Sequence, residues 1–291
     1  MDTEKCRVFL KVLEVGSLTG AAEMLGYTVS GVSRLVASIE KEAGTPLLIR
    51  NRDGVRATAE CEMLLRSIRE MAYWGERFEH RVRSIHGIET GLVVAGSSYD
   101  AYYPWLSRLI SGFSALHPGI EMRILEGTSS ELAEKVDSHE GDFCICSERK
   151  GHHRFLPLVE DELVAIVPRS NPVSEWKDFP LRQFEKEPFI DIYPGKETDN
   201  SRTFAKYHIQ PNVRYSTMDR FAGYSMAEAG LGVCMENRLI ARRYGREVAV
   251  LPLRPRQTVR IGVVYPEKDV ISPAAETFVR YALEETERPV L

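Results

Sequence analysis

The stretch Leu18–Ile39 constrains the fold of this chain more than any other part of the sequence. Its first part predicts a short helix in which the small residues Ala21 and Ala22 let a second helix approach closely. Gly26 ends that helix, because glycine adopts a positive φ without steric cost. Thr28 then supplies the hydroxyl that caps a second helix. Two short helices joined by a tight turn form a helix-turn-helix.

The second predicted helix has two different faces. Its apolar residues recur at helical spacing and point toward a core: Val32, Leu35, Val36 and Ile39. The opposite face is short and polar apart from one valine, and comprises Val29, Ser30, Ser33 and Arg34. A small face of this kind fits the major groove of duplex DNA. Two amphipathic helices of a domain that never contacts DNA are the alternative that spacing alone leaves open.

A hairpin is predicted directly after these helices. The residues from Leu47 to Asn51 read as an extended run, and Asp53-Gly54 is typical of a two-residue hairpin turn. Such a hairpin beside a recognition helix is a wing. Three cations, opposed only by Asp53, fall within seven residues: Arg50, Arg52 and Arg56. A local cluster of this kind suits DNA phosphates, and a solvated charged hairpin is the alternative.

Residues 8–61 resemble the winged helix-turn-helix of the LysR-type transcriptional regulators. The matching residues are Phe9, Leu10, Gly16, Ser17, Ala21, Ala22, Leu25, Thr28, Ser30, Val32, Ser33, Arg34, Ile39, Glu40, Gly44, Pro46, Leu47, Arg50, Gly54, Val55 and Thr58. Val29 departs from the glutamine that the family often carries, and suits contact with a thymine methyl group. With this resemblance, the candidate DNA-contacting residues are Thr19, Thr28, Val29, Ser30, Ser33, Arg34, Arg50, Arg52 and Arg56.

A long helix is predicted to follow, because no proline occurs between Thr58 and Pro104. Apolar or small residues recur at alternating spacings of three and four: Cys61, Leu64, Ile68, Met71, Gly75, Phe78, Val82 and Ile85. This heptad seam favours pairing with a second helix, and a helix packed on its own domain is the alternative. The resemblance also implies pairing here, into a homodimer or homotetramer. The candidate dimerisation residues are Leu64, Ile68, Met71, Phe78 and Val82.

The rest of the chain alternates predicted strands and helices, which is typical of an α/β fold. The pattern begins at Leu92–Ala95 and restarts at Leu163–Val167. The resemblance extends over the whole chain and implies a periplasmic-binding-protein-like effector domain of two α/β subdomains. The predicted division is a winged helix-turn-helix domain over 1–58, a linker helix over 59–88 and an effector domain over 89–291. Subdomain I takes residues 91–162 plus 267–291, and subdomain II takes 163–266.

A ligand of such a domain is expected in the cleft at the carboxyl ends of the strands. The candidate effector-binding residues are Ser97, Ser98, Thr128, Ser129, Tyr193 and Thr217. The hydroxyls follow strands and open helices, where free backbone N–H groups and positive helix ends suit an anion. The alternative for each of these serines and threonines is that it only caps a helix. The resemblance implies a small organic acid or an amino-acid-like metabolite as the effector.

Composition and motifs exclude several other classes of protein. The net charge of -4 does not itself indicate a nucleic-acid partner, so the arginine cluster carries that inference. No stretch reaches the roughly 20 apolar residues of a membrane span, and the charged N-terminus does not read as a secretory signal. We find no P-loop, nucleophile elbow, zinc-protease motif or dinucleotide fingerprint, so we expect neither an enzyme nor a cofactor. The charged pair Asp219-Arg220 is expected on a solvated face or at a hinge.

The five cysteines are odd in number and scattered, which favours reduced thiols and a cytoplasmic protein. Cys144 and Cys146 lie at i, i+2 on a predicted strand, without the usual Cys-x2-Cys spacing of metal ligands. They leave a thiol- or metal-responsive regulator open as an alternative.

The main prediction is a sequence-specific DNA-binding transcription regulator controlled by a small molecule bound between two α/β subdomains. A regulator that needs no ligand is the other alternative. The expected partners are a double-stranded DNA operator, the effector and further copies of the chain. RNA polymerase is a further candidate.

Overall fold

The structure is a computed structural model that describes residues 2–51, 54–85, 90–242, 247–267 and 271–286. The chain divides into two compact units. The first unit comprises Met1–Leu92, Gly119–Glu121 and Ser272–Thr277, and the second comprises the remaining residues.

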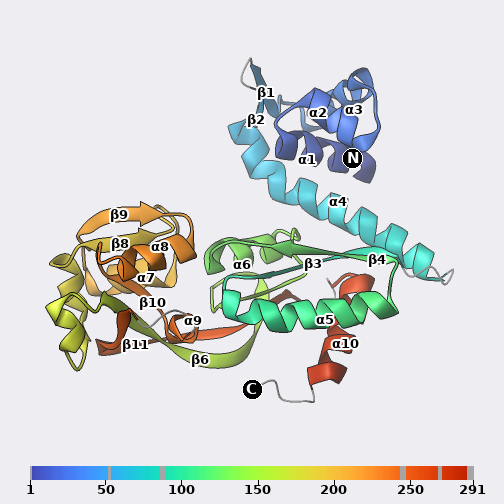
Figure 1. The fold of residues 1–291 in the computed structure, drawn as a ribbon. Helices are drawn as coiled ribbons and strands as arrows, with labels where there is room; N and C mark the ends of the chain where they lie inside the picture. Colours follow the sequence, from blue (N-terminus) through green and yellow to red (C-terminus); the bar gives the residue numbers. More distant parts are fainter. Residues whose placement is uncertain (1, 52–53, 86–89, 243–246, 268–270, 287–291) are drawn as a thin grey trace. The chain divides into compact units, whose positions relative to one another are not determined.

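The first unit begins with three helices whose ends follow from the sequence (Figure 1). They are α1 (Thr3–Val15), α2 (Leu18–Leu25) and α3 (Val29–Ala43). Thr28 caps α3 by accepting a hydrogen bond from the backbone N–H of Gly31, and Ser17 caps α2 in the same way. Gly26 ends α2 with a φ of 70°, as predicted. The predicted helix-turn-helix is therefore present.

The core of this unit is formed by the predicted apolar faces. Its buried residues include Phe9, Val12, Ala21, Ala22, Val32, Val36, Ile39 and Leu47. Leu35 is only partly buried at the edge of this core. The helices thus pack through one face each and leave the other face of α3 to solvent.

The wing is an antiparallel hairpin of β1 (Leu48–Asn51) and β2 (Gly54–Ala57). The register pairs Asn51 with Gly54, and the two intervening residues lie outside the described part of the chain. Gly54 has a φ of 123°, and a Cβ there would lie 2.7 Å from the carbonyl oxygen of Gly16. The backbone N–H of Val55 donates to that oxygen at 2.8 Å. Glycine is therefore required where the wing meets the turn between α1 and α2.

The long helix α4 (Ala59–Ile85) is present, but its predicted seam is divided between two faces. Cys61 and Ile68 are fully buried in the core of their own unit, and Met71 packs against it. A Cβ on Gly75 would lie 2.4 Å from Thr3. The interpretation of these positions as a continuous dimer seam is wrong, because the small three-helix domain completes its own core with this side of α4.

The second unit is built on one twisted sheet with the order β10-β6-β11-β5-β3-β4. The first elements of this unit are β3 (Gly91–Ser97), α5 (Tyr103–Leu116), β4 (Ile120–Leu125), α6 (Ser129–Asp137) and β5 (Phe143–Ser147). β3 and β5 are parallel. Every residue of β5 is buried, as expected for a strand covered on both faces. With α10 (Pro273–Thr286) these elements form subdomain I.

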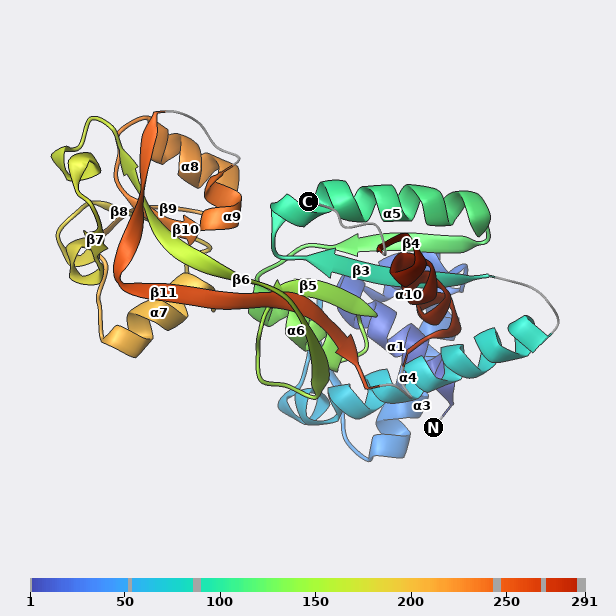
Figure 2. The ribbon, with the colours of Figure 1, turned by 90° about the horizontal axis from the view of Figure 1, so that it is seen from below.

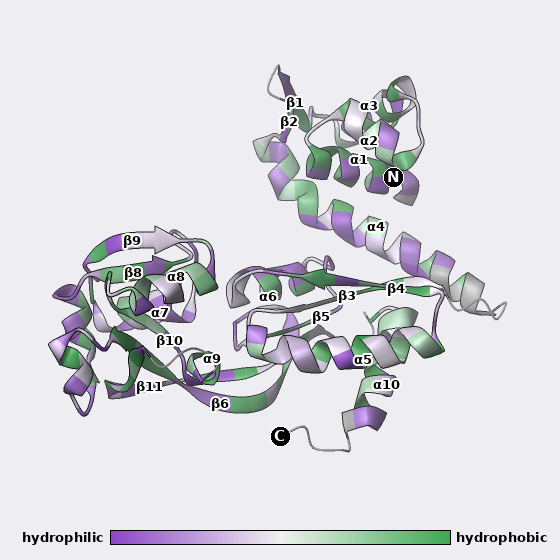
Figure 3. Ribbon diagram, in the orientation of Figure 1, coloured by the Kyte–Doolittle hydropathy of each residue, from purple (hydrophilic) through white to green (hydrophobic). Residues whose placement is uncertain are grey.

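Subdomain II contains its own parallel strand pair. Its elements are η2 (Pro172–Glu175), β7 (Phe179–Pro180), η3 (Leu181–Glu185), β8 (Phe189–Ile192), α7 (Asp199–Tyr207), β9 (Val213–Thr217), α8 (Arg220–Glu228), β10 (Cys234–Asn237) and α9 (Arg238–Ala241). Four aromatic rings pack together in its core: Phe179, Phe184, Phe189 and Phe204. The hydropathy colours of Figure 3 show hydrophobic residues in β8, in keeping with this core.

Two long antiparallel strands, β6 (His153–Pro168) and β11 (Val248–Pro266), run through both subdomains (Figure 2). The sequence predicts only Leu163–Val167 as a strand here, and the structure shows that the preceding residues of β6 are mostly exposed. Pairing with β11 makes them a strand nevertheless. β11 already pairs with β5 at Ile261–Val264, so the chain returns to subdomain I before the predicted boundary at residue 266.

Phe278 of α10 completes the core of subdomain I. Its ring lies 5.0 Å from that of Phe113 on α5 and 5.3 Å from that of Phe143 on β5. The last described helix thus fills a space between elements from the start of the same subdomain.

Candidate functional site

The exposed face of α3 carries residues that are predicted to contact DNA. Val29, Ser30 and Arg34 are exposed, and Ser33 is partly buried. Arg34 has no hydrogen-bond or ion-pair partner within the described ranges, so its guanidinium is available to a ligand. Val29 is 45% exposed beside short polar side chains, an arrangement that suits contact with a thymine methyl group.

The two threonines of the candidate set differ in their surroundings. Thr19 is exposed in the first turn of α2. The Thr28 hydroxyl accepts from the backbone N–H of Gly31 at 3.1 Å and lies 3.3 Å from the Ser30 hydroxyl. Thr28 therefore has a structural part as a cap, whatever else it contacts.

The wing arginines are spread over both faces of the hairpin. Arg50 pairs across the strands with Val55, and Arg56 pairs with Ile49, so the two arginines point to opposite faces. Both are exposed, and the Arg50 guanidinium lies 3.6 Å from the Glu40 carboxylate. Arg52 lies outside the described residues. A thin hairpin of this kind presents cations on both sides rather than as one cluster.

In the second unit, a small cleft lies where the strand ends of the two subdomains meet. Its free volume is about 40 Å³, room for a few water molecules. The lining residues from subdomain I are Ser98, Tyr99, Thr128 and Ser129. Those from subdomain II are Ile192, Tyr193, Thr198, Asp199, Asn200, Arg220, Glu236 and Asn237.

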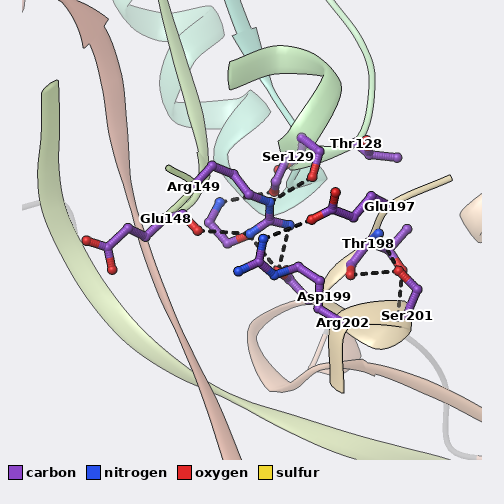
Figure 4. A network of polar contacts seen from close by, with 12 residues as sticks. Thr128, Ser129, Glu148, Arg149, Glu197, Thr198, Asp199, Ser201 and Arg202 are labelled. Atoms are coloured by element: carbon purple, nitrogen blue, oxygen red, sulfur yellow. Dashed lines mark hydrogen bonds and ion pairs between the residues drawn. The ribbon is translucent and has the colours of Figure 1, made fainter. Parts of the chain in front are cut away.

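The carboxylate of Asp199 is the centre of the polar contacts across this cleft (Figure 4). Its Oδ1 accepts from the Ser147 hydroxyl at 2.6 Å and from the Arg149 guanidinium at 2.9 Å. Its Oδ2 accepts from the Tyr99 hydroxyl at 2.9 Å. Burial, together with the charge of Asp199, raises the pKa of Tyr99 well above its usual value, so the phenol keeps the proton that it donates.

A second ion pair lines the cleft from subdomain II. The Arg220 guanidinium donates to the Glu236 carboxylate at 2.9 Å and to the backbone carbonyl of Ser98 at 3.2 Å. Burial raises the pKa of Glu236, and the adjacent Arg220 acts in the opposite direction. The side-chain nitrogen of Asn237 is buried and has no hydrogen-bond partner. The cleft therefore combines compensated charges with one unused donor.

Models of known protein families match both the N-terminal part and the C-terminal part of the chain. The model of the bacterial regulatory helix-turn-helix protein, lysR family, matches residues 3–62, and that of the LysR substrate binding domain matches residues 86–287. The chain belongs to the LysR family of transcriptional regulators. A LysR-family regulator is a DNA-binding transcription factor with an effector-binding domain and is not an enzyme.

Relatives of this LysR-family chain match it over nearly its whole length. The uncharacterized HTH-type transcriptional regulator YvbU of Bacillus subtilis (strain 168) is 25% identical, over 98% of each chain. The crystal structure of full-length CbnR complexed with its target DNA is 18% identical, covering 98% of this chain and 99% of that one, with a TM-score of 0.58. The effector binding domain of QuiR in complex with shikimate is 21% identical, covering 69% and 100% respectively, with a TM-score of 0.55.

Four of the six predicted effector residues of this LysR-family chain line the cleft: Ser98, Thr128, Ser129 and Tyr193. The other two do not. The Ser97 hydroxyl donates to the backbone carbonyl of Tyr99 and accepts from its N–H. Thr217 ends β9 instead of opening a helix, because Asp219 caps α8.

The charged residues of the cleft were not predicted from the sequence. Asp199 is the first residue of α7, and Arg149 follows β5 by two residues. Arg220 is expected on a solvated face or at a hinge, but its side chain is partly buried and pairs with Glu236. Each follows a strand end or opens a helix, as the predicted hydroxyls do. Applying the same positional criterion to charged residues would have found Arg149 and Asp199.

The cysteines give no support to thiol or metal sensing. Cys144 and Cys146 are fully buried in the core of subdomain I. Burial raises the pKa of both thiols, that of Cys146 to about 12, so the thiolate needed for metal binding or oxidation is disfavoured. Within the described ranges, no group of three metal-ligating side chains comes together. Among the same residues, no helix is both long and apolar enough to cross a bilayer.

Proposed function

We propose that this LysR-family regulator binds a small acidic effector in the cleft lined by Ser98, Ser129, Arg220 and Asn237. The observation that carries the proposal is the unused side-chain nitrogen of Asn237, a buried donor on a residue that lines the cleft. A buried donor without an acceptor costs roughly 1–3 kcal/mol, which a ligand oxygen would recover. The shikimate bound to the effector domain of QuiR is a hydroxylated carboxylic acid and supports the same class.

The proposed output is a change in the geometry of the DNA-bound oligomer. β6 and β11 connect the two subdomains as a hydrogen-bonded pair, so a ligand that alters the cleft acts on both strands together. We infer that this motion biases how subunits assemble, and thereby how the DNA is spaced or bent.

We propose that the exposed face of α3 binds in the major groove of DNA and that the wing arginines contact the phosphates. The complex of CbnR with its target DNA supports this use of the fold. One helix-turn-helix buries little surface, so two linked copies are needed for tight, specific binding. We propose the exposed apolar face of α4 as the pairing surface, formed by Met63, Leu64, Trp74, Phe78 and Val82.

A thermal-shift screen of wild-type protein against small organic acids and amino-acid derivatives tests the effector proposal. A true effector raises the melting temperature with its concentration and changes the affinity for DNA. Replacing Asn237 with Leu removes the donor at nearly constant size without adding a charge and should weaken binding of the compound by about 10-fold. A protein that responds to none of the compounds in either assay would favour the ligand-independent regulator.

A further inference from the structure

The side chain of Asp199 does not cap α7, the helix that it begins. Thr198 caps α7, and its hydroxyl accepts from the backbone N–H of Ser201. The Asp199 side chain instead reaches into subdomain I, where its carboxylate is only 12% exposed. Its position therefore needs an explanation beyond helix capping.

The donors that hold this carboxylate form a complete anion site within subdomain I. They are the Tyr99 hydroxyl, the Ser147 hydroxyl and the Arg149 guanidinium, which lie 2.6–2.9 Å from its oxygens. Arg149 is fixed independently of Asp199, because it also donates to the Ser130 hydroxyl at 2.8 Å and to the Glu148 carbonyl at 3.0 Å (Figure 4). A buried guanidinium without an anion would be strongly unfavourable, so the site is built to hold one.

The charges in and beside the cleft balance only while an anion is in place. Two cations, Arg149 and Arg220, face two carboxylates, Asp199 and Glu236. If Asp199 leaves, one positive charge is uncompensated, and a ligand with a single carboxylate restores the balance. A cavity of about 380 Å³ is lined by Ser147, Arg149 and Asp199, so an organic acid has room to reach this site.

We propose that Asp199 is an internal ligand of a carboxylate site in subdomain I, and that an acidic effector replaces it there. This proposal rests on the proposed function and adds its regulation. Asp199 belongs to subdomain II, so its release removes a contact that bridges the subdomains. Other contacts that bridge the subdomains include Lys196 to Glu131 at 2.6 Å and Arg220 to the Ser98 carbonyl. When the acid binds, the Asp199 carboxylate is released and the subdomains lose one contact across the cleft, so binding of the acid favours opening of the cleft.

The test uses acetate as the probe and Asp199→Ala as the variant that empties the site. In calorimetric titrations of the full chain, with chloride replaced at constant ionic strength, the variant should bind acetate at least about 10-fold more tightly than wild-type protein. The double variant with Arg149→Ala should lose this binding. Circular dichroism and sedimentation establish that each protein is folded.

Glu197→Ala is the matched control. Glu197 lies two residues before Asp199 and forms an ion pair with Arg202 of the same subdomain at 2.8 Å. Its replacement removes the same charge from the same segment and should leave acetate binding at the wild-type level. Should Asp199→Ala not fold, Asp199→Asn keeps the shape and substitutes a weaker ligand, which acetate should displace more readily than it displaces Asp199.

A folded Asp199 variant that binds acetate no better than wild-type protein would overturn the proposal, because the carboxylate would then be a structural bridge alone. The same holds if the double variant retains the binding. Neither result depends on the unidentified effector, so the internal-ligand proposal and the effector proposal can fail separately. Once an acidic effector is found, Asp199→Ala should bind it more tightly than wild-type protein does.

Discussion

Arg34 is the residue on which base readout most depends. It is the cation that lies among Val29, Ser30 and Ser33 on the exposed face of α3, and the described residues give it no partner. Against duplex DNA selected by wild-type protein from a random library, Arg34→Ala should lose roughly 10- to 100-fold in affinity. Fluorescence anisotropy measures the loss, and sedimentation should show an unchanged oligomer. If Arg34→Ala binds this DNA as tightly as wild-type protein, base readout does not depend on Arg34 and must be assigned to another surface.

The cysteines offer a second test at the level of single residues. All five are buried, and the pKa of Cys146 is raised to about 12. At pH 8 only about one Cys146 in 10,000 would be a thiolate, by the distance between pH and pKa. Native protein should therefore not react with a thiol reagent such as Ellman's reagent, whereas urea-unfolded protein should show five reactive thiols. Rapid labelling of the native protein would revive the thiol-sensing alternative.

The capping residues were readable from the sequence, but the charges in the cleft were not. Thr28 and Gly26 are placed by local backbone requirements, which a single sequence carries. Asp199 meets Arg149 across fifty residues, and only the packing of two subdomains brings them together. The same is true of Arg220 and Ser98.

At the level of elements, α4 shows how one pattern can serve two surfaces. Ile68 and Ala72 close the core of the first unit, whereas Trp74 and Phe78 are exposed on a neighbouring face of the same helix. Because small and apolar residues occur on both of these faces of α4, their combined spacing resembles a single heptad repeat. The spacing predicts a helix correctly, but it does not distinguish a partner in the same chain from a second copy.

The exposed face of α4 predicts the behaviour of one substitution. Phe78 is 71% exposed, and a second subunit would bury its ring. Phe78→Asp should weaken self-association by at least about 10-fold, since it places a charge in an apolar interface. Analytical ultracentrifugation over a concentration series measures the effect.

Phe221→Asp provides the control for this experiment. Phe221 is 67% exposed on α8 of subdomain II, so the exchange is chemically identical at a site outside the proposed pairing surface. Equal weakening by both substitutions would argue against pairing through α4.

At the scale of the whole molecule, the salt dependence of DNA binding reports how many copies take part. Arg50 and Arg56 are both exposed on the wing. Replacing both with Ala removes up to two phosphate contacts per subunit. By counterion release, the slope of log affinity against log salt should fall by about 1.8 for one wing and about 3.6 for two. Titrations at several salt concentrations distinguish these values, and a slope equal to that of wild-type protein would exclude the wing from phosphate binding.

The architecture as a whole could be predicted because strand–helix alternation is a local pattern that the sequence repeats. The extent of β6 and β11 could not, because the first half of β6 contains Pro157, is mostly exposed, and is a strand through its pairing with β11. The small volume of the cleft is likewise a property of side chains packed from two subdomains.

The place of α10 has a consequence for the order in which the chain acquires its structure during synthesis. Phe278 packs against Phe113 and Phe143, yet the whole of subdomain II is made between them. On the ribosome, subdomain II therefore has all of its residues before subdomain I has its last helix. During that interval the rings of Phe113 and Phe143 lack their cover. A nascent chain stopped before residue 273 should expose them to chaperones, even though most of the protein has already been translated.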